Sequence, residues 1–520
     1  MTRSFDSIVI GGDANGLTAA IGLAQRGSRV LVLEAGADLG GTFREIEFAP
    51  GFRAAPLASD AGYLSPEVVR ALGTTPAAET TSDPAVVSLA EDEPLLLRSS
   101  VEQTAEGLKR FSDKDAQRWP EFAGRMHALA GFLGELYRAP APRINMDTAG
   151  EFLALAKLGR KYRGLGKTNM VELLRTLPMA LADLLDDNFE SDRLKGVLAA
   201  LGVMDVCQGP MAGGTAFTFL HRQVGARPGV FSERLRLKGG AISLINALAD
   251  RARSLGVAIE TGTAVGRITV RDGAVQGVTL ASGEDIQARK VVSSLDPYRS
   301  LLELVDPAYL DPEFIQAVRN IRYRGVTSKI LVALDQLPSV AGATVSLKGS
   351  FLIAPSLRYV ERAYDATKYG RISDQPVVEV RFPSVGQSNL APAGKHVAVL
   401  HVQFTPHRLR EGRWDAEAGE ALADSVIPLV DRHIPGFAAR VRAHAVLSPA
   451  DIESRFGLRE GAISQGEMML DQILFMRPVA GAANHAMPIS GLYLCGASTH
   501  PGEGLTGLPG WLAAQAASAR

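Results

Sequence analysis

The chain has 520 residues, of which 46% are hydrophobic and 21% are charged, and its formal net charge is −1. That length exceeds what one ordinary hydrophobic core accommodates, so we expect a globular protein of two domains. A balanced charge creates no positive field of the kind that attracts nucleic acid, and we therefore expect no nucleic-acid partner.

The two cysteines, Cys207 and Cys495, lie far apart in the sequence. This spacing excludes a disulfide framework, a cysteine-rich zinc site and dithiol redox chemistry. At the N-terminus, Asp6 precedes a short apolar run that soon turns glycine-rich, unlike a secretory signal. No stretch reaches the roughly 18 apolar residues of a membrane-spanning helix. We therefore expect a cytoplasmic protein.

The first predicted element is a strand at residues 7–10, which leads into a glycine turn and a helix. Apolar residues at helical spacing continue as far as Gly27, and a second buried strand, RVLVL, ends in Glu34. This order is typical of a dinucleotide-binding unit, in which an acid about 20 residues after the first glycine binds the ribose hydroxyls. The glycine motif in this context predicts a Rossmann-type fold.

The glycine turn departs from the usual G-x-G-x-x-G pattern, because residues 11–16 read GGDANG. Asp13 replaces the glycine that lets the backbone approach a pyrophosphate. Two unit charges about 5 Å apart at an effective dielectric of about 20 repel by about 3 kcal/mol. That loss would weaken a nanomolar binder to near micromolar rather than abolish binding. A unit that has kept the fold but lost its ligand stays open as the alternative.

Residues 105–205 are rich in Leu, Ala, Lys and Arg at helical spacing. We interpret one apolar stripe there as packed core rather than as a cofactor contact: Trp119, Phe122, Met126, Leu129, Phe132, Leu133 and Leu136. Residues 152–167 then join the apolar FLALA to the basic KLGRKYRGLGK. This segment could make a peripheral contact with an anionic membrane surface, although a solvated helix face is the commoner meaning of such a charge run.

Short β-branched runs alternate with turn dipeptides over residues 257–295, which predicts hairpins. Further strands are expected at residues 327–334, 377–382 and 396–404. These later strands predict a mixed sheet that belongs to a substrate-binding domain.

Near the C-terminus, residues 491–510 read GLYLCGASTHPGEGLTGLPG, and the helical composition WLAAQAASA follows. A strand at residues 492–495 thus delivers a glycine-rich turn to the start of a helix. Main-chain N–H groups and the positive end of the helix dipole can face a ligand at such a position.

The pairing of the N-terminal unit with this turn resembles the phytoene desaturase and carotenoid oxidoreductase group of FAD enzymes, within the flavin amine oxidase superfamily. It is most similar to the branch of pyridine-nucleotide-disulfide-oxidoreductase-domain-containing proteins. The resemblance continues through residues 40–55, 213–225, 238–248, 262–297 and LDQILFMRP at 470–478.

The resemblance implies an α/β fold, α+β overall, with a Rossmann-type FAD-binding domain that is discontinuous in sequence. This domain would comprise residues 1–75, 225–300 and 450–520. The inserted substrate-binding domain, a mixed sheet with a helical part, would comprise residues 76–224 and 301–449.

The same resemblance implies the cofactor contacts. In the family, the first β-α-β unit and its acid hold the ADP half of FAD, a Gly-Gly turn passes the pyrophosphate, and the final glycine turn meets the isoalloxazine ring. Carried over to this chain, the expected FAD contacts are Gly11, Gly12, Asp13, Asn15, Gly16, Glu34, Gly40, Gly41, Val265, Gly496, Gly504 and Leu505.

Glu503 is a second departure, because it stands where the family has a glycine in HPGGG. A carboxylate near the ring would disfavour the anionic reduced flavin and lower its reduction potential. Both departures thus put negative charge beside the expected cofactor, Asp13 at the phosphates and Glu503 at the ring.

No Ser/His/Asp order, metal-spaced histidine cluster or paired-carboxylate motif stands out, so we expect the chemistry to belong to the cofactor. His500 lies in the turn expected to face the flavin, which makes it, with Glu503 beside it, the candidate catalytic group as a proton donor or substrate-orienting residue. His221 falls in an apolar helix and is expected to be a hydrogen-bonded core histidine. Cys495 is expected only to pack.

The first hypothesis is an FAD-dependent oxidoreductase that moves a hydride between an apolar, unsaturated small molecule and flavin N5. Two alternatives stay open. The protein could use bound FAD without net redox turnover, as an isomerase does, or it could lack the flavin and act as a binding or scaffold protein.

Overall fold

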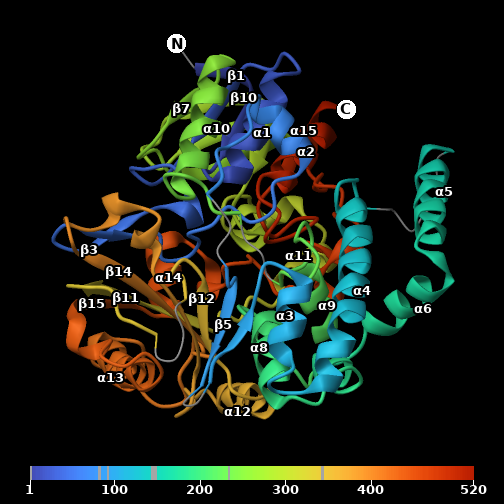
Figure 1. Cartoon of the computed structure of the whole chain (residues 1–520). Helices are drawn as coiled ribbons and strands as arrows, with labels where there is room; N and C mark the ends of the chain where they lie inside the picture. The colour runs from blue at the N-terminus through green and yellow to red at the C-terminus, as the bar shows by residue number, and fades with distance from the viewer. Residues whose placement is uncertain are drawn as a thin grey trace.

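The computed structural model describes residues 3–79, 83–90, 93–141, 149–231, 235–340 and 345–519. Two large sheets organise these residues, one close to both ends of the chain and the other below it in the view of Figure 1. A group of helices flanks the second sheet (Figure 1). The mixed α/β architecture predicted from the sequence is confirmed.

The first sheet has seven strands in the order β7-β2-β1-β10-β9-β8, and β16 also pairs with β10. The pairings of β1, β2, β7 and β16 are parallel, whereas β8, β9 and the start of β10 are antiparallel, as the hairpin pattern predicted. Strands from three distant segments of the chain therefore meet in one sheet. Their bounds are Arg3–Ile10 (β1), Val30–Leu33 (β2), Ala258–Glu260 (β7), Val265–Arg271 (β8), Ala274–Leu280 (β9), Asp285–Ser293 (β10) and Leu492–Leu494 (β16).

Three helices pack together on one side of this sheet: α1 (Ala14–Ala24), α10 (Ile242–Ser254) and α15 (Leu508–Ser518). Their apolar residues form one core with those of β1 and β2. The first and last helices approach very closely, because a Cβ at Gly510 would collide with the carbonyl oxygen of Asn15. This contact joins the two ends of the chain at the predicted cofactor turn.

The second sheet has the strand order β15-β11-β14-β13-β12-β5-β6 and is antiparallel except between β5 and β12. The three strands predicted here appear as β11, β13 and β14 with ends that differ by at most one residue. A short hairpin, β3 (Ile46–Ala49) and β4 (Phe52–Ala54), stands apart. The bounds in the sheet are Val86–Leu89 (β5), Leu95–Leu97 (β6), Thr327–Leu334 (β11), Ser350–Ile353 (β12), Val377–Arg381 (β13), His396–Gln403 (β14) and Val441–Leu447 (β15).

The helical region predicted from residue 105 to residue 205 is also observed. In α4, the side chains of the predicted apolar stripe are buried or packed against the same core. The helices α5 and α6 lie outside the main body of the molecule, at the right of Figure 1. The bounds are Val101–Leu108 (α3), Asp113–Tyr137 (α4), Ala149–Gly164 (α5), Gly166–Thr176 (α6), Leu181–Asp186 (α7), Asp192–Val203 (α8) and Thr215–His221 (α9).

The remaining helices are short connections or cover the outer faces of the sheets. The longest of them, α13, packs its apolar face on the second sheet. The bounds are Pro66–Leu72 (α2), Pro312–Arg319 (α11), Leu357–Lys368 (α12), Ala416–His433 (α13) and Pro449–Phe456 (α14).

Candidate active site

The first glycine turn connects β1 to α1 at the carboxyl edge of the first sheet. Gly11 has a φ of +102°, and a Cβ there would collide with the Ser294 hydroxyl. A Cβ at Gly16 would in turn collide with the carbonyl oxygen of Gly11. The two outer glycines of the motif are therefore required by the tight path of the backbone, whatever the turn binds.

Asp13 occupies the N-cap of α1. Its Oδ1 accepts the Gly16 N–H at 2.7 Å, which satisfies one of the donors left open at a helix start. Burial raises the pKa of Asp13 to about 6, and the nearby Glu34 adds to this shift. The acid is thus accommodated because it caps its own helix, a role that the G-x-G-x-x-G comparison does not reveal.

Glu34 is held by backbone donors at the end of β2. Its Oε2 accepts the Gly12 N–H and its Oε1 accepts the Gly36 N–H, each at 2.7 Å. The N–H of Thr263 donates to the Glu34 carbonyl at 2.8 Å, which brings the segment before Val265 alongside. The acid after the second strand therefore stands in a defined orientation beside the glycine turn.

The predicted Gly-Gly turn lies against the same glycine turn. The Gly40 N–H donates to the Gly12 carbonyl at 3.0 Å, and a Cβ at Gly41 would lie 2.7 Å from the Cβ of Asp13. These residues leave no room for a side chain between the two turns.

The C-terminal turn meets these segments as the resemblance implied. A Cβ at Gly496 would collide with the Ser294 carbonyl oxygen, and the side chain of Asn15 accepts the Gly507 N–H at 3.0 Å. Tyr63 donates its N–H to the Gly504 carbonyl at 2.9 Å. The two ends of the chain and the segment around Tyr63 thereby enclose a common space.

That space is a cavity of about 1410 Å³, part of which is open to solvent. Five of the predicted site residues line it, namely Asp13, Asn15, Glu503, Gly504 and Leu505. The other predicted glycines, Glu34 and Val265 stand behind its wall or beside it. We call this space the first cavity. Residues that line it and that the sequence did not single out include Thr42, Leu57, Asp205, Arg222, Gln465, Met468 and Thr506.

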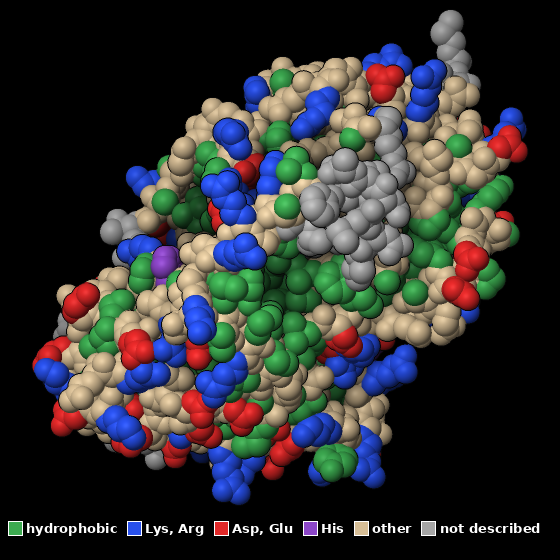
Figure 2. All heavy atoms as spheres, turned by 90° about the vertical axis from the view of Figure 1, so that its right-hand side faces the viewer, with side chains coloured by type: hydrophobic (Ala, Val, Ile, Leu, Met, Phe, Trp, Pro, Cys, Tyr) green, Lys and Arg blue, Asp and Glu red, His purple; other side chains and the backbone are tan. Residues whose placement is uncertain are grey.

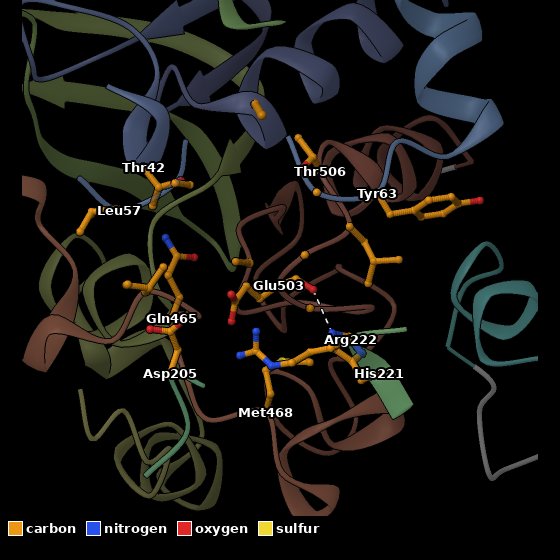
Figure 3. Close-up of a pocket in the computed structure, with 18 of the residues that line it drawn as sticks. Thr42, Leu57, Tyr63, Asp205, His221, Arg222, Gln465, Met468, Glu503 and Thr506 are labelled. Atoms are coloured by element: carbon orange, nitrogen blue, oxygen red, sulfur yellow. Dashed lines mark hydrogen bonds between the residues drawn. The ribbon is translucent and has the colours of Figure 1, made fainter. Parts of the chain in front are cut away.

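Polar side chains from several elements meet in the first cavity. Figure 3 shows that the side chains of Glu503, Arg222, Gln465 and Asp205 reach toward the same space. An Arg222 N–H donates to the Met204 carbonyl, which fixes the side chain near the cavity. The wall is therefore more polar on this side than an apolar substrate alone would require.

His500 does not line the first cavity. Its side chain is fully buried, and its Nε2–H donates to the Ala139 carbonyl at 3.0 Å. Burial lowers the pKa of His500 to about 3. The C-terminal turn directs this side chain toward the end of α4, so His500 is placed neither to orient a substrate in the cavity nor to donate a proton there.

His221 reaches the cavity wall instead. Its Nε2 lies 3.0 Å from the Glu503 carbonyl oxygen, and its Nδ1 lies 2.9 Å from the Tyr137 hydroxyl (Figure 3). Burial lowers the pKa of His221 to about 4, so the ring is neutral. Because the carbonyl can only accept, Nε2 carries the proton and Nδ1 accepts from Tyr137. His221 is thus hydrogen-bonded, as expected, and it fixes the peptide that carries Glu503.

Arg477 supports the same turn from behind. It is 2% exposed, and its guanidinium donates to the carbonyls of Ser464, Gly466, Glu467, Gln472 and Ala497. Burial lowers its pKa to about 10, a shift that the charge of Glu503 opposes. It is therefore charged at neutral pH. Only its place after the apolar ILFM in the sequence could have drawn attention to it.

A second cavity of about 1380 Å³ adjoins the first, and part of it is also open to solvent. Asp60, Gly62, Tyr63, Arg222 and Val224 line both, so the two spaces are neighbours across these residues. Much of the wall of the second cavity is apolar, with Leu64, Val86, Leu201, Met204, Val230 and Phe231 among its residues.

One end of the second cavity carries buried ion pairs. Arg381 donates to Glu379 at 2.8 and 2.9 Å and also pairs with Asp60. Arg236 lies 3.7 Å from Asp60. Sequence reasoning missed this group, since Asp60 and Arg381 are separated by 321 positions and neither belongs to a short motif.

Neither cysteine adds a reactive group. Cys207 and Cys495 are both buried, and burial raises the pKa of the Cys207 thiol to about 11 and that of Cys495 well above its usual value. Among the described residues, no three His, Cys, Asp or Glu side chains are grouped closely enough to hold a metal ion. Within the same residues, no helix combines the length and apolar character needed to cross a bilayer.

Comparison with protein families gives two matches. The family described as flavin containing amine oxidoreductase matches residues 66–353, and the NAD(P)-binding Rossmann-like domain matches residues 9–59.

Several curated proteins are similar in sequence. Pyridine nucleotide-disulfide oxidoreductase domain-containing protein 2 of Rattus norvegicus is 31% identical over 97% of this chain and 92% of its own. A limonene dehydrogenase protein of Castellaniella defragrans is 26% identical over 99% and 94%. A neurosporene-forming phytoene desaturase of Cereibacter sphaeroides is 26% identical over about half of each chain, 52% and 51%.

Solved structures share the fold at low sequence identity. An oxidoreductase from Methanosarcina mazei has a TM-score of 0.59 at 16% identity, covering 99% of this chain and 100% of its own. Wild-type putrescine oxidase bound to putrescine has a TM-score of 0.62 at 13% identity, covering 100% and 99%. At these identities the likeness concerns the fold alone.

Proposed function

The chain belongs to the family of flavin-containing amine oxidoreductases, and from that premise we propose that it binds FAD in the first cavity and moves a hydride between the flavin and an apolar, unsaturated molecule. The observation that carries the proposal is the meeting of the N-terminal and C-terminal turns around one cavity that adjoins a second, largely apolar one. Bound FAD would supply N5 as the hydride acceptor or donor.

The residues of the first turn fit the ADP half of FAD. Each carboxylate oxygen of Glu34 accepts one backbone N–H, and each has a second lone pair for a ribose hydroxyl. The start of α1 would meet the phosphates, as helix N-termini do. Asp13 shares that position, and its charge is the feature of this site that opposes a pyrophosphate.

The residues of the C-terminal turn suit the flavin ring. Glu503, Gly504 and Leu505 form the wall of the first cavity, and His221 holds the Glu503 peptide in place through its carbonyl. Arg477 holds the Ala497 carbonyl of the same turn. A fixed wall keeps a bound ring in one orientation, which hydride transfer requires.

The second cavity suits the substrate. Its apolar side chains can bury a hydrocarbon body, and the apolar walls would exclude water during transfer. The ion pairs of Arg381 at one end also offer hydrogen-bonding groups to a substrate that carries a polar atom.

The test compares FAD with FMN, which lacks the ADP half. Purified protein is titrated with each flavin while the visible absorption spectrum and the melting temperature are recorded. We expect FAD to bind and to raise the melting temperature, and Glu34→Ala to weaken FAD at least tenfold without changing the affinity for FMN.

The control variant is Glu313→Ala, an exposed acid at the start of α11, which should leave both titrations unchanged. Absence of a flavin spectrum and of any FAD-dependent rise in melting temperature would refute the proposal. A flavin that binds but resists reduction by dithionite would favour the non-redox use of the cofactor.

A further inference from the structure

Large hydrophobic side chains are exposed on α5 and α6. Leu153 is 55% exposed, Val171 is 57% exposed and Leu174 is 64% exposed, although Leu side chains are usually buried. Figure 2 looks onto the side of the molecule where these two helices lie and shows hydrophobic side chains gathered in its middle, with Lys and Arg side chains around them.

The exposed apolar residues share helix faces with basic ones. Leu153, Lys157 and Arg160 follow at spacings of four and three, which places them on one face of α5. Lys167, Val171 and Leu174 repeat this spacing on α6. We call these six residues the α5–α6 surface.

Contacts with the main body use the opposite side of α5. The ring of Tyr162 lies 5.8 Å from that of Phe132 of α4, and Lys161 pairs with Glu135 at 2.8 Å. At 3.6 residues per turn, Tyr162 lies across the helix from Leu153 and Lys157. The α5–α6 surface therefore faces away from α4.

The cations of this surface have no acidic partner. Lys157, Arg160 and Lys167 are exposed and form no ion pair with any other residue that the structure describes. Other basic residues nearby do pair, such as Arg175 with Asp187. The α5–α6 surface thus combines apolar side chains with uncompensated positive charge.

We propose that the α5–α6 surface docks the protein on an anionic lipid bilayer. Basic side chains attract anionic head groups, and adjacent apolar side chains gain by entering the boundary with the acyl chains. A second copy of the chain would fit poorly, because a symmetric contact would set Lys157, Arg160 and Lys167 close to the same cations of the partner. This inference does not depend on the proposed redox function.

The test is sedimentation of the full chain with vesicles of phosphatidylcholine alone and of phosphatidylcholine mixed with phosphatidylglycerol. We expect binding only to the anionic vesicles, and loss of that binding in 1 M salt, where charges are screened beyond about 3 Å. The variant Lys157→Gln, Arg160→Gln, Lys167→Gln should partition about a hundredfold less, since each basic residue near the surface contributes about tenfold or slightly less.

Matched controls separate this surface from general charge and hydrophobicity. Replacing Arg319, Arg358 and Arg362 by Gln removes three exposed cations from α11 and α12. This change should leave most of the binding intact. The apolar pair Val171→Ser, Leu174→Ser should reduce binding at least tenfold, whereas the exposed pair Tyr309→Ser, Tyr369→Ser, 46% and 60% exposed, should not.

Three results would overturn the proposal. The wild-type chain could fail to bind anionic vesicles, or the α5–α6 variants could bind as well as the wild type. Light scattering could also show a dimer that Val171→Ser, Leu174→Ser dissociates while no vesicle binding is seen, which would assign the surface to a second copy.

Discussion

Asp13 has two opposite effects at the scale of a single residue. Its side chain caps α1 through the Gly16 N–H, a contact that typically stabilises a helix by about 1 kcal/mol. The same carboxylate lines the cavity where phosphates would bind. The cap explains how an acid can occupy this turn, and the raised pKa of about 6 shows that its charge is already costly before any phosphate arrives.

The first prediction concerns the pH dependence of FAD binding. Below pH 6 Asp13 is protonated and no longer repels the pyrophosphate, so FAD affinity should rise as the pH falls from about 7.5 to 5. Asp13→Asn keeps a capping side chain without the charge. It should bind FAD up to about a hundredfold more tightly at pH 7.5 and with little pH dependence, as measured by fluorescence titration.

The apoprotein provides the control for this prediction. A carboxyl pKa raised to about 6 in the folded state gives stability that is present below the unfolded pKa and is lost as the pH rises. The free energy of unfolding should therefore fall by at most about 3 kcal/mol between about pH 4 and pH 6 in the wild type. Asp13→Asn should lack this component, and identical pH profiles of the two proteins would contradict the assignment.

At the scale of elements, the contact between α1 and α15 decides the geometry of the site. The two helices start at the two predicted turns, and the Asn15 side chain accepts the Gly507 N–H at the N-cap of α15. Gly510 lets the helix backbones approach until no side-chain atom fits between them. The position of each turn is thus set by packing of the other helix.

Two helical glycines should respond in opposite ways to alanine. Gly510→Ala inserts a methyl group against the Asn15 carbonyl oxygen and should destabilise the protein by about 1–3 kcal/mol. Gly124 of α4 has no neighbouring atom within 4 Å, and Gly124→Ala should stabilise it by about 0.5–1 kcal/mol. Urea denaturation measures both, and equal effects would mean that the helices can separate without cost.

At the scale of the whole molecule, the first cavity is built by segments from widely separated parts of the chain. The N-terminal turn, the residues around Tyr63, the α9 region with Arg222 and the C-terminal turn all contribute to its wall. A ligand there contacts residues on both sides of the gap between the two sheets, so binding should stabilise more than the first sheet.

Hydrogen exchange with and without FAD tests this expectation. We expect added protection in residues 57–63, 205–222 and 497–506, which line the first cavity. Helix α13 contributes no residue to either cavity and serves as the internal reference. Protection confined to residues 11–36 would show that a dinucleotide binds without engaging the rest of the wall.

Local patterns in the sequence determined much of the fold. The β-branched runs became strands of both sheets, and the stripe of Trp119, Phe122 and Met126 became the buried side of α4. Such patterns are reliable because the period of a helix or strand fixes which residues share a face. The glycine turns could be located for the same reason, since tight backbone paths restrict the residue type.

Only the tertiary structure decided which side chains face the cavity. The sequence favoured His500 over His221, yet packing directs His500 into the interior and brings His221 to the Glu503 carbonyl. Likewise, no local pattern could join Asp60 to Arg381. The direction of a side chain at a turn, and the partner of a buried charge, depend on residues hundreds of positions away, and they are set only when the two sheets and their helices have packed together.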